Sequence, residues 1–462
     1  MRRFWRPRKR AGTRLSSMPA PAGSDCRRDE STGRGCPKLG TDMIVQAKIP
    51  LHRMILSLSE ALDYVHPRTA DHQRRVAYIA FNLAREMDVS KQDLLDIFMA
   101  ASLHDIGLIR GDNRLLATDI EQLEALEWHC QTGYEVLRDS PILARAAEIV
   151  RHHHTEWQWP DKRNDSDIPH GAHIVALADF VERAINRATP ILGQSKHIID
   201  QVVGQSGSRF CPECAEVFQT IAQPAAFWLD CVSQRVYGVL LKDVEGPDLP
   251  ATDVSIQQIA EIFGRVVDAM SRWTATHTCG VAASAVALCR ALNFAPRGQA
   301  YMHTAGWLHD LGKLAIPASI LDFEGKYTDR EWAVMKTHTY HTFRTLETAG
   351  IPQDIVEWAA FHHERLDGKG YPFSHRAEDL TLGARIMGVA DMFGAIAEDR
   401  PYREAMSKTQ VLKTLARSVS SGALDGDIVT VFRRNYDDID GARRQEVARY
   451  SQGQQRLASI AA

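Results

Sequence analysis

The sequence lacks any apolar run approaching the ~18 residues that suggest a membrane span, and no apolar signal core follows its basic start, MRRFWRPRKR. It also lacks an excess of either charge, since 55 Lys and Arg against 58 Asp and Glu give a net charge of −3. This balance gives no general attraction to nucleic acid polymers or anionic membranes. With 44% hydrophobic and 24% charged residues, the 462-residue chain is typical of a soluble globular protein of two or three domains.

Cysteine is scarce for this length. Eight cysteines without an export signal indicate reduced thiols and a cytoplasmic location. One CxxC is present, 211-CPEC-214, and a single CxxC with no second pair nearby is a weak indication of zinc. Two polar ends complete the picture: residues 1–42, rich in Arg, Gly, Ser and Pro, predict a disordered basic tail, and residues 446–462 predict a polar tail.

The chain repeats itself. His72 and His104 are 32 residues apart, and so are His277 and His309. The match continues along the chain, pairing 67–80 with 272–285, 174–185 with 386–397, and 207–218 with 422–432. In the last pair Cys211 and Cys214 align with Asp425 and Ile428, which argues against a zinc site at CPEC. The repeat predicts two copies of one domain, over residues 43–245 and 250–445.

Most segments of both copies read as helix. In 382-LGARIMGVADMFGAIAED-399, apolar residues recur at spacings of three and four, and the opposite face is Ala, Gly and Met. Such a helix is apolar almost all round and should be buried. No alternating strand pattern of useful length is present. The predicted fold class is all-α.

Buried polar residues on these helices point to chemistry. Asp391 lies on the apolar helix, and Asp310 lies between Leu308 and Leu311. Burying a lone carboxylate costs several kcal/mol unless it is paired, hydrogen-bonded or metal-bound. Any one such residue is explained as well by a helix cap or a core hydrogen bond. Metal binding is indicated by the set, which has a counterpart at closely matching spacing in the first copy: His277, His309, Asp310, His338, His362, His363 and Asp391.

Five imidazoles and two carboxylates are too many for one metal ion and suit two. The mixture favours Fe, Mn or Zn over Ca or Mg. Two metals ~3.5–4 Å apart need a shared bridge, and a carboxylate next to a histidine ligand is well placed to supply it. Such a centre makes hydroxide from water and stabilises both oxygens of an in-line displacement at phosphorus. The predicted chemistry is hydrolysis of a phosphate ester or diester.

Two motifs of the second copy resemble the HD-GYP family, a branch of the HD phosphohydrolases: 308-LHDLGKLAIP-317 and 362-HHERLDGKGYP-372. His338, Asp391 and 399-DRPYR-403 join them, and the resemblance covers residues 250–445. It implies two tandem helical-bundle HD-type domains and two divalent metal ions, iron or manganese first, with Zn, Ni or Co as alternatives. It also implies hydrolysis of the bacterial messenger cyclic di-GMP to pGpG or GMP.

The resemblance assigns roles residue by residue. One metal would be held by His277, His309, Asp310 and Asp391, and the other by His338, His362 and His363, with Asp310 bridging. Asp310 and Lys313 would be the catalytic residues, with Lys313 also contacting a substrate phosphate.

The rim of the expected site carries the remaining assignments. Arg400 and Arg403 would hold phosphates and guanines of the substrate, although either arginine alone could be a solvated helix end. Gly368 and Gly370 would let the loop turn, with Tyr371 and Pro372 shaping the rim and Tyr371 contacting substrate. Some family members add a third metal through a glutamate four residues before the first histidine; Trp273 stands there, which favours two metals.

The first copy keeps a plausible second ligand set but loses the substrate groups. The candidates are His72, His104, Asp105, His129, His153, His154 and Asp179, and spacing leaves open whether His152 or His154 is the spare member of the triple. Leu108 replaces the lysine, 155-TEWQWPDKRNDSD-167 has no GYP loop, and 187-RATPI-191 lacks the second arginine. We expect a degenerate or repurposed domain.

Two further hypotheses stay open. The metal chemistry could serve another cyclic dinucleotide or a nucleotide phosphate, because the GYP loop and arginines discriminate weakly. The chain could instead be a catalytically weak signalling scaffold, although a pure scaffold has no need for seven buried polar groups. The expected partners are a cyclic dinucleotide substrate and either a second copy of the chain or a signalling protein, with no nucleic acid polymer and no membrane.

Overall fold

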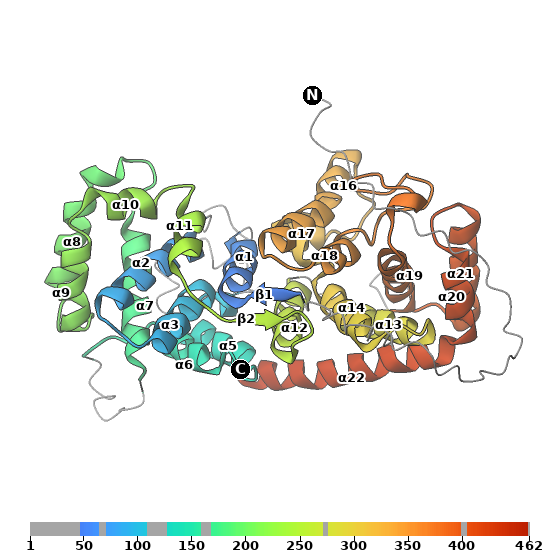
Figure 1. Cartoon of the computed structure of the whole chain (residues 1–462), viewed down its shortest axis with the longest axis horizontal. Coiled ribbons are helices and arrows are strands. Elements are labelled where there is room, and N and C mark those ends of the chain that lie inside the picture. Colours follow the sequence, from blue (N-terminus) through green and yellow to red (C-terminus); the bar gives the residue numbers. More distant parts are fainter. Residues whose placement is uncertain are drawn as a thin grey trace, which may run out of the picture. The chain divides into compact units, whose positions relative to one another are not determined.

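The computed structural model describes residues 47–63, 71–108, 127–158, 168–270, 276–398 and 404–460 (Figure 1). The predicted all-α class with two tandem helical-bundle HD-type domains is confirmed. The predicted tail at residues 1–42 lies outside the described residues. Among the described helices, none combines the length and apolar character needed to cross a membrane.

The first half, which holds the first copy of the repeat, is built over its described residues from helices of 7 to 15 residues and two short 3-10 turns. Ser90 caps one of them by accepting a hydrogen bond from the backbone N–H of Asp93, as expected of an N-cap serine. The helices and 3-10 turns are α1 (Leu51–Asp63), α2 (His72–Glu86), α3 (Lys91–Leu103), η2 (Ile106–Leu108), α5 (Glu127–Leu137), α6 (Ala144–His152), α7 (His170–Ala184), η5 (Ile191–Gly193), α8 (Ser195–Gly204), α9 (Pro212–Ile221), α10 (Ala225–Cys231) and α11 (Val236–Asp243).

The second half repeats the order of the main helices, with matched helices of similar length. Thr381 caps the apolar helix predicted over 382–399, which runs from Leu382 to Ala397 and is buried along most of its length. The elements are α12 (Val254–Ala269), α13 (His277–Ala291), α14 (Pro296–Leu308), η6 (Leu311–Ala315), α15 (Ala318–Leu321), α16 (Asp329–Met335), α17 (Thr337–Thr348), α18 (Gln353–Ala360), η7 (Ala377–Asp379), α19 (Leu382–Ala397), α20 (Lys408–Ser420), α21 (Gly426–Arg434) and α22 (Tyr436–Ile460).

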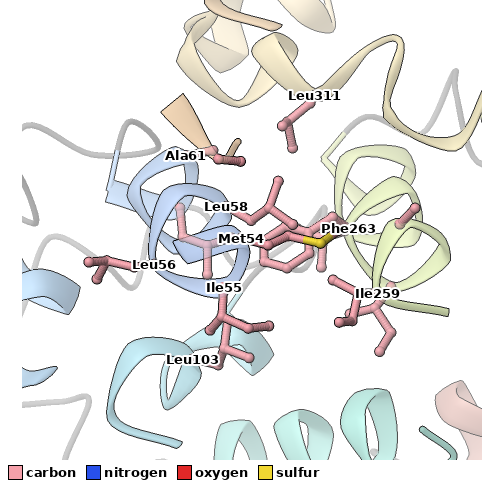
Figure 2. Packing of buried hydrophobic residues seen from close by; sticks show 14 of the residues in the cluster. Met54, Ile55, Leu56, Leu58, Ala61, Leu103, Ile259, Phe263 and Leu311 are labelled. Carbon is pink, nitrogen blue, oxygen red and sulfur yellow. The ribbon is translucent and has the colours of Figure 1, made fainter. Parts of the chain in front are cut away.

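Helix α1 contacts both halves of the repeat. It packs on α2 and α3 of its own half and on α17 and η6 of the other half. Figure 2 shows Met54 and Leu58 of α1 pointing towards Phe263 of α12, with Leu311 close by. The Arg53 side chain adds a polar tie, donating from Nε to the Thr348 carbonyl oxygen at 2.7 Å. Helix α1 is buried almost all round by these contacts. Residues 46–462 form one compact unit, so the predicted domain boundary at residues 245–250 stays a prediction.

A small sheet accompanies this helix. The strands β1 (Lys48–Pro50) and β2 (Asp248–Pro250) pair antiparallel, with Ile49 opposite Leu249. Each strand has three residues and contains a proline, so neither could show the alternation that identifies strands in a sequence. The sheet therefore joins the start of the first half to the segment that leads into the second.

The C-terminal segment differs from the expected polar tail. Helix α22 continues through residues 446–460 and packs along α13. Tyr450 is buried, with its ring centroid 6.3 Å from that of Trp307. Upstream in the same helix, Arg443 donates from Nε to Asp440 Oδ1 at 3.0 Å, and both side chains are buried. A few apolar residues at helical spacing are enough to hold a helix whose composition is otherwise polar.

The glycine after each His-Asp pair allows a close backbone approach. A Cβ atom on Gly107 would lie 2.0 Å from the His129 carbonyl oxygen, and one on Gly312 would lie 1.9 Å from that of His338. The Gly312 N–H also donates to Thr342 Oγ1 at 2.9 Å. In both halves this contact brings the turn that follows the aspartate against the helix that carries the next histidine.

We expect Gly312→Ala to lower the free energy of unfolding by at least about 1–3 kcal/mol, because the new methyl group meets backbone rather than a side chain that can move. The measurement is denaturant unfolding with a chelator present, so that metal affinity does not contribute. Gly193→Ala in η5 is the matched control, since a Cβ there meets nothing within 4 Å. Equal stability of the two variants would contradict the close-approach explanation.

Candidate metal centres

Seven side chains predicted as ligands converge in the second half. They come from helix ends and one helix centre: His277 begins α13, His309 and Asp310 follow α14, His338 lies in α17, His362 and His363 follow α18, and Asp391 lies within α19. All seven are buried except His363, which is partly exposed.

The carboxylate of Asp310 lies between two pairs of histidines. Its Oδ2 is 3.2 Å from His309 Nε2 and 3.9 Å from His277 Nε2. Its Oδ1 is 3.5 Å from His338 Nε2 and 3.9 Å from His362 Nε2. Each oxygen of one carboxylate therefore faces its own pair of imidazole nitrogens, which is the arrangement that a bridging carboxylate needs.

Asp391 and His363 extend the two groups. Asp391 Oδ1 lies 3.2 Å from His277 Nε2, and Asp391 Oδ2 lies 3.6 Å from His363 Nδ1. The potential ligand atoms of His338, His362 and His363 all lie within 4.8 Å of one another. The first group thus combines imidazoles with carboxylates, and the second consists mainly of imidazoles.

Backbone carbonyl groups fix the orientation of three of these rings. His309, His338 and His362 each donate a hydrogen bond of 2.7 Å from Nδ1 to the carbonyl oxygen three residues earlier, those of Gly306, Met335 and Ala359. A neutral ring held in this way turns its Nε2 lone pair into the cluster, as metal-binding histidines do.

The fit to a cation can be tested at His309. Its Nε2 atom is buried and has no hydrogen-bond partner among the described residues. With the proton on Nδ1, the Nε2 lone pair faces a lone pair of Asp310 Oδ2 across 3.2 Å. Two acceptors in that position repel each other unless a proton or a metal cation lies between them. The donor set therefore fits a metal ion.

The pKa values of four histidines in the cluster fall into two groups. Burial lowers the pKa values of His338, His362 and His363 to about 3, so these rings are neutral at neutral pH. Burial alone would also lower the pKa of His277, but the Asp391 and Glu398 carboxylates raise it to about 10. In the absence of a metal, His277 therefore carries a proton between the Asp391 and Glu398 carboxylates.

The first half places its predicted ligands in the same way. Asp105 Oδ2 lies 3.3 Å from Nε2 of both His72 and His104, and its Oδ1 lies 3.8 Å from His129 Nε2. Asp179 Oδ1 lies 3.4 Å from His72 Nε2. The structure brings all seven predicted residues of this half together. Asp179 lies within α7, and the others lie near the ends of α2, α3, α5 and α6.

The structure shows which two of the three consecutive histidines at 152–154 lie in the cluster. His129 Nε2 lies 3.3 Å from His153 Nε2, and the ring centroids of His129 and His154 are 5.0 Å apart. His152 instead ends α6. His153 and His154 therefore lie in the cluster, together with the neighbouring Cys130, whose thiol could also reach a metal there.

Two supporting glutamates were missed by the sequence analysis. Glu182 Oε2 lies 2.5 Å from His72 Nδ1, and Glu398 Oε2 lies 3.3 Å from His277 Nδ1. A carboxylate behind a ligand histidine orients the ring and raises its basicity. Glu182 follows Asp179 by three residues on the same buried helix face, a signal that the sequence offered. Glu398 follows the last turn of α19 and had no such signal.

The two clusters differ in the cations beside them. Lys313 donates from Nζ to Asp310 Oδ2 at 2.5 Å, whereas Leu108 stands at the corresponding place in the first half. In the first half Arg183 forms a short ion pair with Asp179, one turn along the same helix. The cation of the first cluster thus pairs with the aspartate of the long helix, whereas the cation of the second cluster pairs with the aspartate of the His-Asp pair.

The GYP loop lies against the second cluster. The Tyr371 ring centroid is 5.0 Å from that of His363 and 6.3 Å from that of His338. The Glu364 carboxylate fixes the loop by accepting hydrogen bonds from the N–H groups of Phe373 and His375 at 2.7 and 3.0 Å. The predicted substrate residues Arg400 and Arg403 lie outside the described residues, as does Trp273.

Comparisons with known proteins agree with this geometry. The family model described as an HD domain matches residues 259–428, and a second HD domain model matches residues 69–184. The 3'3'-cGAMP-specific phosphodiesterase 1 of Vibrio cholerae is 28% identical over 407 residues, covering 85% of this chain and 93% of that protein. A cyclic di-GMP phosphodiesterase of Pseudomonas aeruginosa is 35% identical over 145 residues, covering 31% of this chain and 35% of that protein.

A solved structure shares the fold along most of the chain. It is a cyclic GMP-AMP-specific phosphodiesterase of V. cholerae, with a TM-score of 0.58 and 22% identity, covering 84% of this chain and 98% of that one. Both repeats thus match HD family models, and the second carries the HD and GYP motifs beside its ligand cluster. The chain belongs to the HD superfamily of metal-dependent phosphohydrolases, as a tandem HD protein whose second half carries the HD-GYP motif set.

Proposed function

We propose that the second half is a phosphodiesterase that hydrolyses a cyclic dinucleotide at two divalent metal ions. The observation that carries this proposal is Asp310, whose two oxygens face separate pairs of histidine nitrogens. One metal is assigned to His277, His309, Asp310 and Asp391, and the other to His338, His362 and His363, with Asp310 bridging. Iron or manganese suits this mixture of imidazole and carboxylate, with Zn, Ni and Co as alternatives.

The protein's own groups hold and orient the substrate in this proposal. When bound, two such metals activate water and stabilise the oxygens of an in-line displacement at phosphorus. Lys313, held beside Asp310, contacts a non-bridging oxygen of the scissile phosphate and offsets its charge. Tyr371 lies at the rim next to His363, where its ring can face a base or ribose. Arg400 and Arg403 remain the proposed clamps for the second phosphate and the guanine.

Two cyclic dinucleotides compete as the substrate. The motifs of the second half led us to expect cyclic di-GMP, and local relatives at about a third of the chain carry that activity in their names. Two relatives that span both halves are named for 3'3'-cGAMP instead, each over 85% of this chain. Since that similarity includes the tandem arrangement, we favour 3'3'-cGAMP as the preferred substrate and keep cyclic di-GMP as the second candidate.

The first half is proposed as a metal-binding domain without this activity. Its cluster has the ligand geometry, but Leu108 replaces the lysine and Arg183 pairs with Asp179. The lysine proposed to contact a substrate phosphate is therefore absent from this half, whose cation pairs with Asp179 instead. The described cysteines are buried and form no disulfide, which fits the cytoplasmic location that we propose for the enzyme.

His309→Ala should lower turnover of both dinucleotides by at least about 100-fold, since even the loss of a residue that only supports a ligand costs 10–100-fold. His104→Ala, the same change in the first half, is the matched control and should keep activity within about tenfold. The assay follows 3'3'-cGAMP and cyclic di-GMP separately, with Mn²⁺ or Fe²⁺ supplied. Activity that survives His309→Ala but not His104→Ala would reverse the assignment of the active half. No turnover by the unmodified protein with any metal would favour the scaffold hypothesis.

Lys313→Leu, which copies the first half, should reduce kcat by about 10–1000-fold while the metal content per chain stays unchanged, because the lysine acts on substrate charge. The reciprocal change, Leu108→Lys, should leave turnover unaltered because the first half lacks the GYP loop. Both variants are compared by steady-state kinetics and elemental analysis. Loss of metal from Lys313→Leu would show that the lysine serves the metal centre instead of the substrate.

A further inference from the structure

A second kind of cluster lies in the first half, formed by His170, Cys211 and Cys214. Cys211 Sγ lies 3.8 Å from His170 Nε2, and the potential ligand atoms of all three residues lie within 4.8 Å of one another. Both cysteines are buried, whereas the His170 ring is exposed at the surface. The CPEC motif on its own was a weak signal, and the histidine that completes it is distant in the sequence.

The fold brings these residues together at two helix starts. His170 is the first residue of α7, and Cys211 directly precedes Pro212, the first residue of α9. The spacing of three puts Cys214 one turn into α9, on the side that Cys211 faces. The loop before Cys211 is anchored by hydrogen bonds from Trp157 N–H to the Arg209 carbonyl oxygen at 3.0 Å and from Gln158 N–H to that of Ser208 at 2.9 Å.

The second half fastens the corresponding helices with an ion pair. In the aligned repeats Cys211 matches Asp425, and His173, one turn after His170, matches Arg385. Asp425 precedes α21 as Cys211 precedes α9, and its Oδ2 accepts a hydrogen bond from Arg385 Nη1 of α19 at 3.0 Å. The second half lacks cysteines at these positions because an ion pair links the same two helix starts there. The alignment therefore no longer argues against a zinc site in the first half.

We propose that His170, Cys211 and Cys214 bind a structural zinc ion that fastens the start of α7 to the start of α9. Tetrahedral zinc, with Zn–S of about 2.3 Å and Zn–N of about 2.0 Å, puts sulfur and nitrogen ligands about 3.5 Å apart. The 3.8 Å between Cys211 Sγ and His170 Nε2 is close to this separation. Two thiolates and a neutral imidazole also neutralise the charge of the ion, which lowers the cost of partial burial.

The ligand chemistry selects zinc over the metals expected at the histidine clusters. Thiolate ligands favour zinc, whereas the imidazole and carboxylate mixture around Asp105 and Asp310 also accommodates iron and manganese. The fourth position is left to water or to Glu213, whose Oε2 lies 4.0 Å from His170 Nε2. Because α7 also carries Asp179 and Glu182, the zinc ion would hold the helix that completes the first histidine cluster.

Zinc content and cobalt spectroscopy of the full-length protein test this site. Cys211→Ser with Cys214→Ser should lower bound zinc by about one ion per chain, and should abolish the thiolate-to-metal absorption of the cobalt-substituted protein. All variants are made in a Cys130→Ser background, so that the thiol beside the histidine cluster cannot contribute to the absorption. Cys289→Ser, which removes a buried thiol of α13, is the matched control and should leave the absorption in place. His170→Ala keeps both thiols and should weaken zinc binding at least about tenfold.

A restoring variant keeps the test decisive if the cysteine variant unfolds. Cys211→Asp with His173→Arg rebuilds the ion pair of the second half and should stay folded without the zinc ion. Cobalt absorption that persists in the double serine variant of the Cys130→Ser background, or that disappears with Cys289→Ser alone, would overturn the proposal. So would a Cys211–Cys214 disulfide found by mass spectrometry in protein purified under reducing conditions, since that pairing leaves no thiolate ligand.

Discussion

Both halves of this chain depend on the burial of imidazole nitrogens against carboxylate oxygens. With Nδ1 donating to a backbone carbonyl group, the Nε2 atom of His309 turns a lone pair towards Asp310, and neither group supplies a proton for the contact. A proton or a metal cation between the two groups removes this repulsion, and the donor set fits a metal ion. The helix ends, the close approach at Gly312 and the loop around Tyr371 all converge on that arrangement.

The repeat separates metal binding from substrate binding. The His-Asp pair, the glycine after it and the next histidine recur in both halves with nearly the same contacts, because they set the position of the bridging carboxylate. What differs lies around the cluster: Lys313 has become Leu108, and Arg183 pairs with Asp179 in the half without a GYP loop. The first half therefore keeps the ligand geometry, although Leu108 stands where the second half has the lysine proposed to contact a dinucleotide.

Chemically different groups occupy equivalent places where two helix starts meet. The second half joins α19 to α21 through Arg385 and Asp425, and the first half places His170 and two cysteines where α7 meets α9. Helix α1 is a third joint, since its apolar surface is buried against both halves. Because α1 packs against both repeats, no single point in the chain separates their two cores.

The sequence by itself determined the helical class, the repeat and thirteen of the fourteen candidate ligands, because each follows from local periodicity or from a spacing that recurs within the chain. It could not distinguish His152 from His154, find Glu398 behind His277, or connect His170 with Cys211, since those relations join residues that are distant along the chain or differ only in the direction of a side chain. The continuation of α22 through the expected polar tail is of the same kind, because the apolar contact of Tyr450 with Trp307 outweighs a polar composition. Only the tertiary structure decides such contacts, because the stability of each depends on which distant surface is present to bury it.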